Sequence, residues 1–207
     1  MDINDLLKKY GLTLKILSDL SYKSNLGQSL KNDLKYFDKN TVLDELTKVT
    51  EFYDEIDLSN LIDIDFRIKS IDSIKMKFDR YYPDHQLRKV FNDILGLRAL
   101  CDDYNDILTI HSEDFRIADM SNGKANDDGY RGVHIYYQKD NNHYPIEIQF
   151  NTYFDRQLND WLHDYVYKKN YSIDVGKRLR VLYENGKINN INKFKEELEN
   201  VLHSSKK

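Results

Sequence analysis

The chain has 207 residues, of which 40% are hydrophobic and 32% charged, and its formal net charge is −4. These values predict a globular fold with a buried core and exclude a disordered chain. The negative charge argues against broad, non-specific nucleic-acid binding, but it is compatible with a local basic pocket. One cysteine excludes an internal disulfide. No signal peptide or membrane span is predicted, so we expect a cytoplasmic protein.

The N-terminal part of the sequence predicts helices. Apolar residues recur at helical spacing over residues 3–20 and 26–37. A third apolar stripe runs to Tyr53 and follows Thr41, which has the side chain of a helix N-cap. We therefore expect a layer of helices over residues 1–58.

The middle of the chain changes its period. Residues 62–68 alternate between apolar and charged side chains, which predicts a half-buried strand. A helix is predicted over 70–81, which Pro83 closes, and a mostly buried strand over 94–101. Residues 106–118 are compatible with a short helix or a short strand, and the pattern leaves both open.

A polar loop over residues 121–129 precedes two alternating segments, 133–137 and 146–150, which predict a hairpin. Helices are predicted over 153–169 and 176–203. Together the elements predict an α+β fold, with a mixed sheet of about five strands flanked by N-terminal and C-terminal helices.

This fold is expected to form a single domain over residues 1–207. Its catalytic core is expected over residues 59–170, and its C-terminal helices over residues 171–207.

Two acidic side chains are placed where they can bind a cation. Asp93 directly precedes the buried segment 94–101. Glu147 lies in a strand whose neighbouring side chains point to the core, so its carboxylate faces the opposite side of the sheet. Two such carboxylates can hold Mg²⁺ together with substrate phosphates. Ordinary solvent-exposed acids on a sheet face would give the same spacing, and this alternative stays open.

A second group of residues is basic. Arg67 lies near the end of the first predicted strand. Lys69, Ser73 and Lys77 follow at intervals of four residues, which places them on one helix face. Such a face can bind a triphosphate through charge-assisted hydrogen bonds. A solvated helix face is the alternative.

The loop before the hairpin carries an aromatic ring. Tyr130 follows Gly129, and His134 lies four residues later on the next strand. The tyrosine can stack on a nucleobase, and a surface tyrosine at the start of a hairpin is the alternative. No Walker-type phosphate loop is present, and the six histidines show no metal-ligand spacing.

Four segments in this order resemble the RelA/SpoT nucleotidyltransferase family, whose members are alarmone synthetases. They are Arg67–Lys77, Asp93–Arg98, Gly129–His134 and Glu147–Gln149. The resemblance implies the nucleotidyltransferase-like fold of that family. It also implies an ATP-dependent pyrophosphokinase, which moves the β,γ-pyrophosphate of ATP to a ribose 3′-hydroxyl.

The resemblance further implies roles for single residues. The residues that would bind ATP are Arg67, Lys69, Ser73, Lys77 and Arg98. Asp93 and Glu147 would hold Mg²⁺, and Glu147 would activate the attacking hydroxyl. Tyr130 would complete the catalytic set by stacking on the acceptor base, and His134 and Gln149 would also contact the acceptor.

Two positions depart from the family pattern. Alarmone synthetases usually have a serine where this chain has Gly132 and an arginine where it has Asn151. Segments 128–134 and 156–163 look like those of the toxic small alarmone synthetases of toxin–antitoxin systems. Some of those enzymes pyrophosphorylate tRNA. Our leading hypothesis is therefore a toxin that modifies the tRNA CCA end, blocks aminoacylation and translation, and is neutralised by an antitoxin protein.

Two alternatives stay open. The chain could be a small alarmone synthetase that makes (p)ppGpp or (p)ppApp from ATP and a guanosine or adenosine nucleotide. It could also be an inactive nucleotide-binding protein, which the presence of both Asp93 and Glu147 disfavours. The tRNA hypothesis further requires basic contacts to the acceptor stem, and the candidates are Lys31, Lys35, Lys39, Lys168, Lys169, Arg178 and Arg180.

Overall fold

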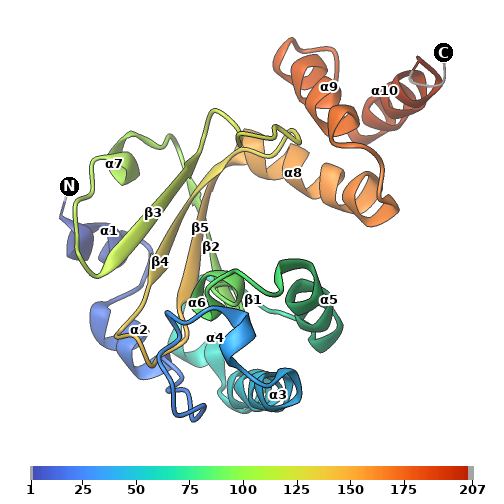
Figure 1. Ribbon diagram of the computed structural model, residues 1–207. Helices are drawn as coiled ribbons and strands as arrows, with labels where there is room; N and C mark the ends of the chain where they lie inside the picture. Colours follow the sequence, from blue (N-terminus) through green and yellow to red (C-terminus); the bar gives the residue numbers. More distant parts are fainter. Residues whose placement is uncertain (1, 205–207) are drawn as a thin grey trace. The chain divides into compact units, whose positions relative to one another are not determined.

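A five-stranded sheet with the strand order β1-β2-β5-β4-β3 organises the computed structural model, which describes residues 2–204 (Figure 1). The strands are Asp65–Ile68 (β1), Leu95–Cys101 (β2), Phe115–Met120 (β3), Gly132–Tyr137 (β4) and Ile146–Thr152 (β5). The predicted α+β class with a mixed sheet of about five strands is confirmed.

Helices precede, interrupt and follow the strands. They are Ile3–Lys9 (α1), Leu14–Leu20 (α2), Lys39–Glu55 (α3), Leu58–Leu61 (α4), Ile71–Tyr81 (α5), Leu87–Val90 (α6), Asn105–Leu108 (α7), Tyr153–Tyr165 (α8), Ile173–Glu184 (α9) and Ile191–Ser204 (α10), with 3₁₀ turns at Leu34–Tyr36 (η1) and Tyr167–Lys169 (η2). Within residues 2–204, no helix has both the length and the apolar character that a membrane span requires.

The contacts divide the chain into two compact units. Unit 1 contains the residues up to Ala99, together with Thr109–Ile117 and His134–Gln149. Unit 2 contains Leu100–Leu108, Ala118–Val133 and the residues from Phe150 onward. Strand β1 therefore belongs to unit 1 alone, whereas β2 to β5 contribute residues to both units.

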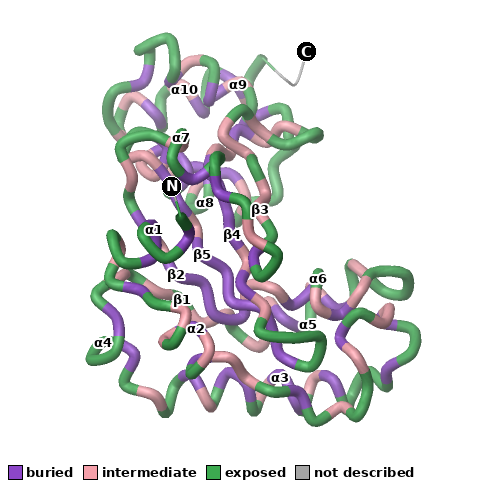
Figure 2. Tube along the Cα trace, turned by 90° about the vertical axis from the view of Figure 1, so that its left-hand side faces the viewer, coloured by how far each residue is buried: buried purple, intermediate pink, exposed green. Residues whose placement is uncertain are grey.

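In the strands of unit 1, successive side chains point to opposite faces of the sheet. Helix α3 packs against α5 and β1, and Ile74 and Phe78 of α5 are buried. Figure 2 shows β4 and β5 mostly buried, whereas α3 alternates between buried and exposed residues. In β4 and β5 this near-complete burial includes polar side chains of the face opposite the apolar core, among them His134 and Glu147.

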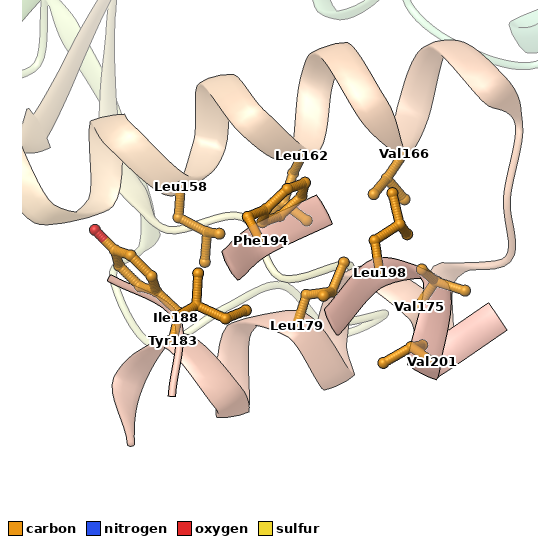
Figure 3. Close-up of a cluster of buried hydrophobic side chains, with 10 residues drawn as sticks. All are labelled: Leu158, Leu162, Val166, Val175, Leu179, Tyr183, Ile188, Phe194, Leu198 and Val201. Atoms are coloured by element: carbon orange, nitrogen blue, oxygen red, sulfur yellow. The ribbon is translucent and has the colours of Figure 1, made fainter. Parts of the chain in front are cut away.

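Unit 2 has its own apolar core between three helices. Figure 3 shows the cluster, in which α8 contributes Leu158 and Leu162, and α10 contributes Phe194. These side chains recur at helical spacing, so each helix presents one apolar face to the others. Burial of this cluster holds α9 against both α8 and α10.

The structure corrects three predicted helices. Residues 3–20 form two helices, because Gly11 has a φ of +70°, and Thr13 caps the second one. Residues 176–203 are likewise divided, and Gly186 has a φ of +70° between α9 and α10. The 153–169 helix ends at Tyr165 and continues only as a 3₁₀ turn.

Residues 26–37 do not form the predicted helix. Their backbone amides are satisfied by segments distant in the sequence, since Leu30 N donates to Asn141 O and Leu34 N donates to His85 O. Such pairing competes with helical hydrogen bonds. The N-cap of α3 is Asp38 rather than Thr41, because the Asp38 side chain accepts a hydrogen bond from the Thr41 amide.

Candidate active site

A small cavity of unit 1 collects side chains from three separate segments of the sequence. It is lined by Arg67, Lys69, Asp93, Gly96, Arg98, Glu147 and Gln149. All of these except Gly96 are residues that the sequence predicts for the site. The two carboxylates predicted to act together therefore line one cavity, facing three cationic side chains.

The register of the sheet explains this arrangement. Strand β1 pairs antiparallel with β2, and Arg67 lies opposite Gly96. A Cβ atom at residue 96 would lie 3.5 Å from Oε2 of Glu147, at ordinary van der Waals contact, so the backbone of Gly96 lies beside that carboxylate. Close approach of a backbone to a functional group is a common reason for glycine inside a strand.

Asp93 is held by two lysines. Its Oδ2 lies 2.5 Å from Nζ of Lys69, and its Oδ1 lies 3.0 Å from Nζ of Lys77. Both lysines, with Ser73 and Arg80, also line a neighbouring cavity of about 230 Å³. The predicted shared face of Lys69, Ser73 and Lys77 is thus present, although Lys69 precedes α5 and its N-cap Ser70.

Glu147 is buried and ionised. Only 5% of the residue is exposed, which by itself would raise the pKa of its carboxyl group. Hydrogen bonds from His134, Gln149 and Tyr136 outweigh this burial and lower the pKa to about 2. Oε1 lies 2.8 Å from Nδ1 of His134, and Oε2 accepts a 2.6 Å hydrogen bond from Gln149. Because an ionised carboxylate only accepts, Nδ1 of His134 carries the proton.

Arg98 contributes a buried donor that the protein leaves unused. Its Nε atom is buried and has no hydrogen-bond partner among the described residues. An unsatisfied buried donor costs free energy, about 1–3 kcal/mol for a polar group. In a cavity lined by further cations, such a donor fits a phosphate oxygen.

Tyr136, which hydrogen-bonds to the carboxylate, and Arg116, which lies over the Tyr136 ring, were not predicted as site residues. The Tyr136 hydroxyl lies 3.3 Å from Nδ1 of His134, and burial raises the pKa of Tyr136, so the hydroxyl stays protonated. The guanidinium of Arg116 lies 4.0 Å from the centre of the Tyr136 ring. The two-residue period from His134 already places Tyr136 on the same face, which is the signal that could have found it.

The loop that carries Tyr130 belongs to unit 2, so the part of Tyr130 in the site stays a prediction. The Tyr130 amide donates to Oδ1 of Asp128 at 3.1 Å. Nζ of Lys124 lies 4.9 Å from the centre of the Tyr130 ring. The ring therefore already has a cation beside one part of its surface.

The side chain of Arg180 holds the loop that carries Tyr130 in place. It is fully buried and donates from Nε to Gly129 O at 2.7 Å, and from Nη1 to Asp155 at 2.7 Å. Asn159 accepts from Arg180 and from the Arg131 amide, and donates to Arg131 O. The expected contact of Arg180 with tRNA is therefore wrong, because this side chain is inaccessible.

The two departures from the family pattern are in contact with each other. A Cβ atom at Gly132 would lie 2.5 Å from Nδ2 of Asn151, too close for any side chain without a shift. Asn151 is buried and donates from Nδ2 to Arg131 O at 2.8 Å. Asn151 thus occupies the space into which a serine side chain at residue 132 would project.

Most of the other side chains predicted to contact tRNA form ion pairs or hydrogen bonds within the protein. Lys31, Lys35 and Lys39 do not share a helix face, because η1 covers only part of this segment. Lys35 pairs with Asp84, and Lys39 pairs with Asp79. Near the C-terminus, Lys168 pairs with Asp164, and Arg178 donates to Ser204.

The donor set of the cavity fits Mg²⁺. No group of three or more histidine, cysteine or acidic residues that could hold a metal occurs between residues 2 and 204. Mg²⁺ seldom needs such a cage, since it is usually held by one or two carboxylates and by substrate phosphates. Asp93 and Glu147 are the two carboxylates that line the cavity.

Comparison with solved structures finds small alarmone synthetases. The chain is 23% identical to small alarmone synthetase 1 from Bacillus subtilis bound to its product pppGpp, with a TM-score of 0.42 and coverage of 80% of this chain and 90% of that one. For small alarmone synthetase 2 of the same organism the identity is 22%, the TM-score 0.40 and the coverage 81% and 91%. For a GTP pyrophosphokinase family protein from Streptococcus pneumoniae, the identity is 23% and the TM-score 0.38. That match covers 81% of this chain and 89% of the other.

Among curated proteins, none matches the chain significantly. The model of a protein family described as "region found in RelA / SpoT proteins" matches residues 66–172, which is more than half of the chain. The matched range contains every residue of the cavity that holds Asp93 and Glu147. The chain therefore belongs to the RelA/SpoT family.

Proposed function

We propose that this protein transfers the β,γ-pyrophosphate of ATP to the 3′-hydroxyl of a guanosine nucleotide, as an alarmone synthetase. The observation that carries the proposal is the convergence of Asp93 and Glu147 with Arg67, Lys69 and Arg98 on one cavity. Family membership supports alarmone synthesis more directly than it supports the tRNA acceptor expected from the sequence.

The basic side chains would bind and orient ATP. Lys69 and Lys77 are ion-paired to Asp93 and line the larger neighbouring cavity, so they can exchange this carboxylate for phosphate oxygens. The unsatisfied Nε of Arg98 would gain an acceptor at the same time. Charge-assisted hydrogen bonds of this kind are roughly twice as strong as neutral ones.

The transfer needs a hydroxyl in line with the β-phosphorus. Its oxygen bonds to that phosphorus, the bond to the α,β-bridging oxygen breaks, and AMP leaves. Glu147 is ionised at neutral pH and can accept the hydroxyl hydrogen bond and then pass the proton to water. His134, Gln149 and Tyr136 hold the carboxylate for this contact.

Asp93 and Glu147 would also hold Mg²⁺. When bound there, Mg²⁺ neutralises the charge that develops on the phosphate oxygens. Tyr130 would stack on the acceptor base, a role proposed on the family resemblance alone.

The test is a transfer assay with γ-labelled ATP, Mg²⁺ and one acceptor at a time: GDP, GTP, AMP or deacylated tRNA. We expect label on GDP or GTP, and a loss of at least about 100-fold in the Glu147→Gln variant. The control is Glu51→Gln, an exposed acid of α3 outside this cavity, which should keep full activity. Equal activity in both variants would remove Glu147 from the mechanism.

A second candidate acceptor is the tRNA CCA end, in a toxin neutralised by an antitoxin protein. Gly132 and Asn151, which lie beside each other, favour the tRNA acceptor. They stand where housekeeping alarmone synthetases usually have a serine and an arginine. In the same assay, label on tRNA and none on GDP or GTP would select this acceptor. Growth arrest on expression, abolished by Glu147→Gln, would support the toxin.

A further inference from the structure

A second cavity of unit 1, with a volume of about 300 Å³, has four cationic side chains on its wall. They are Lys31, Arg88, Lys89 and Arg116. None of them forms an ion pair with any residue between 2 and 204. We name this the Arg116 cavity. In a chain of net charge −4, the four cations around this hollow outnumber its three acids.

The wall of this cavity is fixed by backbone hydrogen bonds. Arg88 N donates to Leu30 O at 2.9 Å, and Leu87 N donates to Asn32 O at 3.0 Å, which joins α6 to the segment that carries Lys31. Leu30 N donates to Asn141 O at 2.9 Å, which joins that segment to the turn after β4. The segments that carry Lys31, Arg88 and Lys89 are therefore joined to each other and to the turn after β4.

Tyr136 is shared between the Arg116 cavity and the Glu147 carboxylate. Its ring lines the cavity and lies under the Arg116 guanidinium, while its hydroxyl contacts His134 and hydrogen-bonds to Glu147. The cavity therefore begins one side chain away from the proposed attack site. It is separate from the cavity lined by Lys69, Ser73 and Lys77, where ATP phosphates would bind.

We propose that the Arg116 cavity binds phosphate groups of the pyrophosphate acceptor. This inference rests on the proposed function only for the identity of its ligand as the acceptor. None of the residues proposed to bind ATP lines this cavity. The shared chemistry is a phosphate, which can belong to the 5′-phosphates of a nucleotide or to the backbone of a tRNA end.

The cavity also has acidic residues, and their removal gives a second test of phosphate binding. Glu113 and Asp114 lie on its wall, both exposed, and neither is ion-paired with the four cations. The third acid, Asp140, is paired with His143. If the ligand is a phosphate, the free acids oppose its binding, and their removal should tighten it.

The experiment compares Lys89→Gln and Asp114→Asn with the control Lys139→Gln. Lys139 is exposed, lies in the neighbouring turn and does not line the cavity, so its variant has the same net charge as Lys89→Gln. Direct titrations without ATP use GDP, guanosine and deacylated tRNA as probes. Transfer assays with the same acceptors give KM and kcat separately.

We expect Lys89→Gln to weaken binding of the acceptor about tenfold, the effect of one lost charge-assisted hydrogen bond. The KM for ATP and the kcat should change less than twofold, and Asp114→Asn should tighten acceptor binding. A loss seen with GDP but not with guanosine assigns the site to nucleotide 5′-phosphates. A loss seen with tRNA but not with GDP assigns it to the polynucleotide backbone.

The inference is overturned if Lys89→Gln binds GDP and tRNA as Lys139→Gln does, or if only the KM for ATP rises. The titrations need no turnover, so they decide the matter even if no acceptor is pyrophosphorylated. In that case the proposed function fails, while weaker binding in Lys89→Gln would still establish the phosphate site.

Discussion

Arg98 and Arg180 differ in how their buried donors are satisfied. Nε of Arg98 has no partner in the part of the chain that the structure describes, whereas all three guanidinium nitrogens of Arg180 donate to named acceptors. A buried donor without a partner lowers stability, and it persists where binding needs it. Removal of the charge should therefore leave stability unchanged or higher at Arg98 and lower it at Arg180.

For Arg98→Met we expect stability that is unchanged or higher by about 1 kcal/mol, because the orphaned donor is removed. ATP binding should weaken at least tenfold, since the variant lacks a phosphate contact. Urea unfolding and ATP titration measure the two effects. A clear loss of stability would show that the donor has a partner in solution.

The buried carboxylate of Glu147 predicts a pH effect on folding. Its pKa is about 2 in the folded protein and ordinarily 4.5, so its stabilising contribution is fully present above pH 4.5. That contribution is lost as the pH falls through 2, and amounts to about 3 kcal/mol.

Urea unfolding between pH 6 and pH 2.5, with a metal chelator present, measures this contribution. Wild type should lose more stability than Glu147→Gln over this range, because the glutamine does not titrate. Parallel curves for the two proteins would mean that the carboxylate is not specially stabilised.

At the level of elements, helix α9 contacts the loop before β4 through the side chain of Arg180, and Oε1 of its Glu184 lies 3.8 Å from Nε of Arg131. Arg180 links Gly129, Asp155 and Asn159, and Asp155 also accepts from Tyr104 at 2.7 Å. The loop that presents Tyr130 is thus held by residues of α8 and α9. Arg180 of α9 thus helps to set the position of the loop that carries Tyr130, a proposed acceptor contact.

Arg180→Met should destabilise unit 2 by about 3–5 kcal/mol, because it leaves Asp155 buried without its charged partner. The matched control is Arg178→Met on the same helix, at a hydrogen bond with Ser204 that is solvent-exposed, and it should change stability by about 0.5 kcal/mol or less. Amide hydrogen exchange should also rise in residues 127–131 of Arg180→Met only. Equal stability of the two variants would contradict the linking role.

At the scale of the molecule, the apolar core between α8, α9 and α10 belongs to unit 2, whereas the cavity lined by Asp93 and Glu147 belongs to unit 1. Phe194 is fully buried in this core, while Ile173 of α9 is 56% exposed. Phe194→Ala should lower the free energy of unfolding by about 3–5 kcal/mol, through lost burial and a residual cavity. Ile173→Ala is the control and should change it by about 0.5 kcal/mol or less. Thermal or urea unfolding separates these outcomes.

The local period of the sequence determined much of the fold. Strands β1, β4 and β5 follow two-residue alternation, and α5 follows helical spacing, because side-chain direction repeats with the backbone geometry of each element. The same alternation placed Glu147 and His134 on the face away from the core. The order of the motifs also predicted the family that the later match established.

What the sequence could not decide depends on contacts between distant segments. Residues 26–37 have a helical apolar pattern, yet their amides pair with residues 85 and 141, so no helix forms. Arg180 looked like a surface cation and is buried, because only the packed helices bring Asp155 and Gly129 to it. The Arg116 cavity likewise exists only once four remote segments are brought together. Periodicity reports how each element faces its surroundings, whereas the neighbours of a charged side chain are chosen by the tertiary fold.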